Sequence, residues 1–137
     1  MKTYSLIEHT ADIAIRVKAR GLKALFKRAA LAMFDIMAEK TAPAAKRKVL
    51  KIVKKAGSPA DLLVEWLNEL LYLSSAKGVI FRQFKVRWMT ERSIAAEAFA
   101  EDVSAYRVHT EIKAVTYHEL SVARKGPLWE AKVVFDV

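Results

Sequence analysis

The residues best suited to chemistry are two aspartates at opposite ends of the sequence, Asp12 and Asp136. Asp136 stands beside the last residue, Val137, so its carboxylate and a terminal or main-chain oxygen would give two hard oxygen donors within one residue. If Asp12 folded against them, the mutual repulsion of three anionic groups would be costly unless a cation were bound, and calcium accepts such ligands flexibly. Spacing alone favours the plainer alternative, in which Asp136 is a solvated strand end and Asp12 a turn or cap residue.

Both aspartates are predicted to lie off the core face of their strands. Apolar residues alternate with basic ones over residues 13–19, which predicts a half-buried strand entered at Asp12. The odd positions from 129 to 137 are apolar, which predicts a final strand whose other side carries Asp136. This placement is compatible with a surface metal site and does not demonstrate one.

Three further side chains offer proton transfer or charge, namely His9, His118 and Lys113. Neither histidine lies in a recognisable motif, and such residues are more often hydrogen-bonding residues of turns and strands. Lys113 is either an exposed strand lysine or a cation near the carboxylates. Cysteine is absent, and a P-loop, a dinucleotide-binding glycine pattern and a nucleophile elbow are all missing. A stand-alone metal hydrolase using His9 or His118 is therefore the weakest functional hypothesis.

The charge balance leaves contact with RNA open. The 137 residues fit a single domain, 1–137, and carry 24 Lys plus Arg against 15 Asp plus Glu, a net charge of +9 that attracts polyanions. Basic clusters around Lys48 and Lys54 could contact tRNA, although a solvated face explains them about as well, and no RNA-binding module signature accompanies them. No stretch approaches the length of a membrane span, so we expect a soluble, cytoplasmic protein without membrane contact.

The periodicity predicts an α+β fold with two helices packed on one face of a mostly antiparallel or mixed sheet of five or six strands. An apolar stripe from Leu22 to Met37 predicts the first helix. The second begins at the cap Ser58 and closes at Gly78. Strands are expected over 13–19, 49–53, 80–88, 94–99, 112–123 and 129–137, with Trp88 on the same face as Ile80 and a hairpin turn at 124–127.

Several long segments resemble the archease family in order and spacing, and the match covers nearly the whole chain. They are EHTADI at 8–13, AALAMF at 29–34, LLVEWLNELL at 62–71, EIKAVTYH at 111–118 and VVFDV at 133–137. The resemblance implies an accessory protein of RNA metabolism rather than an enzyme. Archeases activate the GTP-dependent tRNA-splicing RNA ligase by promoting guanylylation of its active-site histidine and multiple turnover. Some are described as chaperone-like modulators of a tRNA cytosine methyltransferase.

The resemblance also implies residue roles. Asp12 and Asp136 match the family's metal-binding aspartates, Val137 would supply an oxygen to calcium or another divalent cation, and Lys113 matches a functionally important lysine. The chain departs from the family in being more basic, and the acidic stretch expected before EIKAVTYH is thin, with only Glu101 and Asp102.

Overall fold

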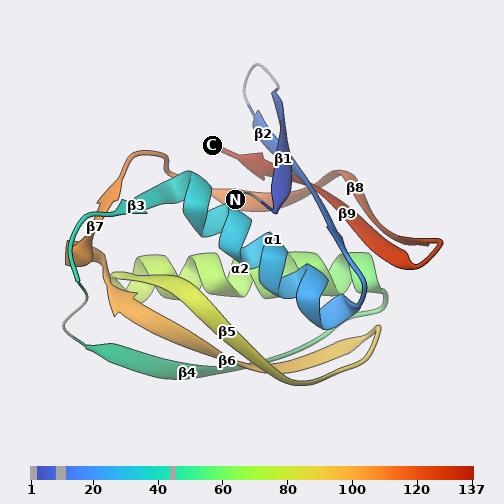
Figure 1. Cartoon of the computed structure of the whole chain (residues 1–137), viewed down its shortest axis with the longest axis horizontal. Helices are drawn as coiled ribbons and strands as arrows, with labels where there is room; N and C mark the ends of the chain where they lie inside the picture. Colours follow the sequence, from blue (N-terminus) through green and yellow to red (C-terminus); the bar gives the residue numbers. More distant parts are fainter. Residues whose placement is uncertain (1–2, 9–11, 44–45) are drawn as a thin grey trace.

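Two crossing helices occupy the middle of the molecule, with β-sheets on either side of them (Figure 1). The computed structural model describes residues 3–8, 12–43 and 46–137. The helices are α1 (Leu22–Met37) and α2 (Pro59–Lys77). A short 3-10 turn, η1, spans Val103–Ala105. Each helix packs against strands of both larger sheets, so the hydrophobic core lies in two layers around the helices.

The strands of the described residues form three antiparallel sheets. The four-stranded sheet has the order β1 (Tyr4–Glu8), β2 (Asp12–Ala19), β9 (Leu128–Asp136), β8 (Ala114–Lys125). The three-stranded sheet has the order β4 (Arg47–Lys55), β6 (Ser93–Asp102), β5 (Val79–Met89). The small sheet pairs β3 (Ala38–Lys40) with β7 (Tyr106–Val108).

The predicted α+β class and the two helices are confirmed, whereas the single sheet of five or six strands is wrong. The described residues contain nine strands in three sheets, and the helices lie between the two larger sheets instead of on one face. The strands missed from the sequence are β1, β3 and β7. Two of them are three residues long, which is too short for an alternating pattern to identify a strand.

Helix α2 begins and ends as its sequence predicts. The hydroxyl of Ser58 accepts a hydrogen bond from the amide of Asp61 (3.1 Å), Pro59 is the first helical residue, and Gly78 closes the helix with a φ of +63°. Trp66 is fully buried, and its indole Nε1 donates to the carbonyl of Phe26 (3.1 Å). This bond ties α2 to α1 across the core.

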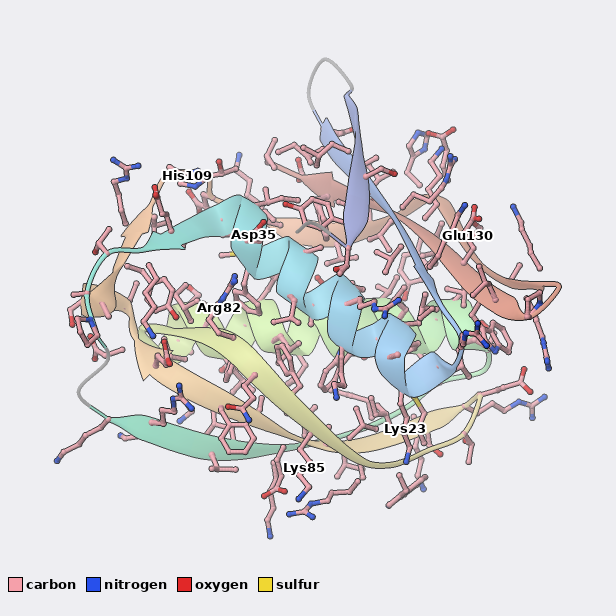
Figure 2. The ribbon with its side chains drawn as sticks, viewed as in Figure 1. Lys23, Asp35, Arg82, Lys85, His109 and Glu130 are labelled. Carbon is pink, nitrogen blue, oxygen red and sulfur yellow. The ribbon has the colours of Figure 1, made fainter. Side chains whose placement is uncertain are left out.

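One carboxylate links β1 to the helical layer. The hydroxyl of Tyr4 donates to Asp35 of α1 (2.5 Å), and Arg82 of β5 lies 3.8 Å from the same side chain (Figure 2). Burial, together with this hydrogen bond, raises the pKa of Tyr4 to about 12. Tyr4 therefore stays a neutral donor over the physiological range, and the contact anchors the outer strand of the four-stranded sheet.

The face assigned to Trp88 is wrong. The pairing of β5 with β6 is irregular between Phe81 and Gln83 and again between Val86 and Trp88. Each irregularity shifts the alternation of side chains. As a result Phe81 is buried beside the predicted Ile80, while Trp88 is 48% exposed on the side facing away from the helices.

Glu101 is a buried structural charge and not part of an acidic surface stretch. It is 3% exposed and accepts hydrogen bonds from the Tyr106 hydroxyl, Lys40 Nζ (3.0 Å) and Arg47 Nε (3.1 Å). The Tyr106 hydrogen bond is the main reason that the pKa of Glu101 is lowered. One carboxylate thus joins β3, β4, β6 and β7.

Among the described residues no helix is long and apolar enough to cross a membrane.

Replacing the cap Ser58 with Ala should lower the free energy of unfolding by about 1 kcal/mol, because the Asp61 amide loses its acceptor at the helix start. Urea denaturation measures the change. Ser75→Ala, at an exposed position inside the same helix, is the control and should be neutral or slightly stabilising. Equal stability of the two variants would show that the cap contributes nothing.

Glu101→Gln should destabilise the protein at neutral pH by about 2 kcal/mol, because the charge-assisted hydrogen bonds to Lys40 and Arg47 are lost. The loss is no larger because these two cations stay partly hydrated in the variant. The pKa of Glu101 is lower in the folded state, so its contribution is complete above the ordinary value of 4.5 and is lost as the pH falls through the folded value. Denaturation from pH 7 to pH 2 should show the wild type and the variant converging in acid. A constant difference across that range, or the same loss in the exposed control Glu65→Gln, would contradict this role.

Candidate metal site at the end of the four-stranded sheet

The antiparallel register of β2 and β9 places Asp12 directly opposite Asp136. The next pair inward is Ile13 and Phe135, and Phe135 is fully buried in the core. Because side chains alternate along a strand, the two aspartates point to the other side of the sheet from Phe135. Asp136 is exposed and Asp12 partly so. The two aspartates therefore lie together at a solvent-accessible corner of the sheet.

Two carboxylates in this arrangement repel each other. Directly opposed residues of an antiparallel pair have their Cβ atoms about 5 Å apart, and like charges there are destabilising. A divalent cation offsets this cost, and calcium suits it because it takes carboxylate and main-chain oxygens in flexible geometry. Val137 follows Asp136 and packs partly against the core, so a main-chain oxygen lies within one residue of the carboxylate along the chain. The donor set therefore fits a hard divalent cation.

Lys113 reaches the same corner from the neighbouring strand. Ala114, the first residue of β8, is opposite Asp136, and the amide of Lys113 donates to the Asp136 carbonyl (2.8 Å). The Lys113 side chain is exposed. Since Lys113 precedes the regular part of β8, strand alternation does not fix the direction of its side chain. The structure thus brings the backbones of Asp12, Asp136 and Lys113 together at adjacent strand ends.

A polar residue of α2, Asn68, supports this corner. Asn68 accepts a hydrogen bond from the Val115 amide (2.9 Å), and its side-chain nitrogen donates to the Val115 carbonyl (3.2 Å). The side-chain amide of Asn68 therefore bonds the edge of β8 as another strand would, one residue after Ala114. A polar amide beside the apolar stripe of α2 was the only signal in the sequence, and it does not reveal the partner.

Of the two histidines, the one that the structure describes lies away from the corner. His9 lies outside the described residues. His118 is exposed, its Nε2 lies 3.4 Å from Glu119, and it is four residues, or about 13 Å of strand, from Ala114. It falls in a segment where residues 117–120 of β8 interrupt the pairing with β9, and Glu119 there has a φ of 49°.

The metal site remains a prediction that rests on few ligands. Within residues 3–8, 12–43 and 46–137, no three His, Cys, Asp or Glu side chains are grouped so that they could hold a metal ion. The site as predicted has two carboxylates, so a main-chain oxygen and water must complete it.

Comparison with known proteins places the whole chain in one family. The model of the archease protein family matches residues 4–137. A protein archease of Methanosarcina barkeri is 37% identical, over 99% of this chain and 97% of that protein, and one of Pyrococcus abyssi is 32% identical over the full length of both.

Two solved structures have a similar fold. A solution structure of a Methanobacterium thermoautotrophicum protein aligns over the full length of both chains with a TM-score of 0.76 and 26% identity. A crystal structure of a Thermotoga maritima archease, described as a possible chaperone, aligns over 96% of this chain and 94% of that one, with a TM-score of 0.63 and 24% identity. With the family model spanning all but the first three residues and full-length relatives above 30% identity, the chain belongs to the archease family.

Proposed function

We propose that this protein activates the GTP-dependent tRNA-splicing RNA ligase by promoting guanylylation of the ligase's active-site histidine. In this proposal the corner of the four-stranded sheet docks beside the ligase active site and presents Asp12, Asp136 and Lys113. Family membership supports this choice of partner. The covalent chemistry stays with the ligase, and this protein acts as its accessory.

The observation that carries the proposal is the direct pairing of Asp12 with Asp136. Opposed carboxylates are unfavourable for a strand pair, so a structural role alone does not explain them. A cation-binding role does, because Asp12, Asp136 and a main-chain oxygen of Val137 together offer the ligands that calcium prefers. When bound, a divalent cation stabilises charge that develops on phosphoryl oxygens.

The exposure of the corner favours action on a partner. Asp136 and Lys113 are both exposed, so a second protein can reach them without a conformational change. The chain's own part is to hold the two aspartates at fixed strand positions and to join the main chain of Lys113 to that of Asp136 by one hydrogen bond. Such preorganisation lets charged groups act on a phosphoryl transfer without reorganising first.

Asp12→Asn and Asp136→Asn should each reduce stimulation of ligase guanylylation by at least about tenfold, because a single lost carboxylate leaves too few anionic ligands for the cation. Single-turnover transfer of labelled GMP to the ligase measures the effect. Glu91→Gln, at the exposed tip between β5 and β6, is a matched loss of one carboxylate and should stimulate normally. Full stimulation by both aspartate variants would refute the proposed site.

Calcium should raise the thermal stability of the wild type and leave that of Asp12→Asn unchanged. In metal-free buffer the variant should be the more stable protein by a few tenths of a kcal/mol, since the opposed charges are gone. At about 100 times the dissociation constant, calcium should add about 2.7 kcal/mol to the wild type alone. Calorimetric scans with chelator and with a calcium series test this without the ligase. An equal calcium response in both proteins would place the cation elsewhere.

A further inference from the structure

The outer face of the β4–β6–β5 sheet carries ordered rows of side chains and faces away from the helices. Figure 1 shows this sheet at the bottom of the molecule with no described element beyond it, and Figure 2 shows Lys85 projecting from it away from the helices. The register aligns three rows across β4, β6 and β5, namely Val49–Phe99–Gln83, Lys51–Glu97–Lys85 and Val53–Ala95–Trp88. We call these nine residues the outer face.

The first and third rows expose apolar surface. Val53 is 62% exposed, and Val49 and Trp88 are each 48% exposed, while Phe99 on the central strand is half-buried. The irregularity before Trp88 turns this ring out of the core, where simple alternation would have placed it. The small side chain of Ala95 leaves a hollow of about 310 Å³ next to Val53. An exposed, partly aromatic surface of this kind on a sheet is suited to stacking against planar groups.

The second row and the flanks are cationic. Both carboxylates on this side of the sheet are already engaged, since Glu97 bonds Arg87 Nε (2.5 Å) and Glu101 bonds Arg47 Nε (3.1 Å). Lys51, Lys55 and Lys85 form none of the ion pairs found among the described residues. These three lysines leave an excess positive charge on the outer face and, at Lys55, on its flank.

The structure also divides the basic cluster that the sequence places around Lys48 and Lys54. Lys54 turns toward α2 and pairs with Glu69 (3.1 Å), and Lys48 lines a separate cavity of about 670 Å³ with Lys46 and Lys77. Lys51 and Lys55 have the opposite parity on β4 and point outward with Val49 and Val53. The outer face is therefore distinct from that cavity.

We propose that the outer face binds single-stranded RNA. Successive rows lie about 7 Å apart along the strands, so a cationic row stands between two apolar rows. This order matches a ligand in which planar bases and phosphates alternate, with bases stacking on Trp88 and Phe99 and phosphates near Lys51 and Lys85. A second copy of this chain is a poor occupant, because a symmetric contact would set lysine rows of a +9 chain against each other. The inference does not rest on the proposed action on the ligase.

Fluorescence anisotropy with a labelled 12-nucleotide single-stranded RNA, titrated over a salt series without ligase, tests this proposal. Trp88→Ala should weaken binding about tenfold, because one stacking platform is lost. Lys51→Ala/Lys85→Ala should lower the slope of log affinity against log salt by about 1.4, since each single-strand phosphate contact contributes about 0.7. Trp88→Phe should keep most of the affinity and lose the RNA-induced quenching of tryptophan fluorescence.

Two controls show whether RNA binding depends on the outer face or only on the positive charge and exposed aromatic rings of the protein as a whole. Lys18→Ala/Lys125→Ala removes the same charge from the four-stranded sheet, and Tyr72→Ala removes an exposed aromatic ring from α2, so both should leave the tryptophan quenching and the affinity nearly unchanged. Absence of binding at low salt would overturn the proposal. So would equal loss in the controls, equal affinity for duplex RNA of the same length, or tighter binding of poly-glutamate, which would indicate an acidic protein partner.

Discussion

The antiparallel register between β2 and β9 determines both how the four-stranded sheet packs on the helices and where its two paired aspartates lie. It joins the first long strand of the chain to the last one and sets Ile13 opposite Phe135 on the core side. A slip of one residue would exchange the faces, exposing Phe135 and burying Asp136, and the loss of a fully buried aromatic would cost several kcal/mol. The packing of the core thereby fixes the position of two side chains that take no part in it. Asp12 meets Asp136 because their apolar neighbours must meet.

The corner is also held from the side, by the helical layer. Asn68 bonds both main-chain groups of Val115, and Trp66, two residues earlier on the same helix, bonds the carbonyl of Phe26 on α1. Helix α2 is therefore fixed to α1 by one side chain and to β8 by another. This arrangement supports the strand end that carries Lys113, whose amide bonds the carbonyl of Asp136. The three residues assigned to the corner come from different strand ends, and one helix connects their supports.

The sequence predicts most of the features that depend on a local pattern of residues. It predicts few of the features that depend on contacts between distant segments or on irregular strand pairing. The parity of Asp12 and Asp136 follows from alternation, and the limits of α2 follow from Ser58, Pro59 and Gly78, so these predictions are confirmed in the structure. The role of Asn68 is not predictable, because its partner is a backbone 47 residues away. The exposure of Trp88 depends on a β-bulge that no residue type signals, and the burial of Glu101 depends on two strands too short to recognise. In each case a long-range contact overrides a local pattern.

The paired carboxylates and the outer face lie on different sheets, on opposite sides of the helices, so a partner engaging one leaves the other accessible (Figure 1). The proposed site has a divalent cation bound between Asp12 and Asp136. A crystal structure of the protein crystallised with terbium, which substitutes for calcium and scatters anomalously, is the sharpest test of this site. We expect an anomalous peak about 2.4 Å from a carboxylate oxygen of both Asp12 and Asp136. A terbium peak only at another place, or no peak at this corner in protein that still stimulates the ligase, would overturn the assignment of the cation to Asp12 and Asp136.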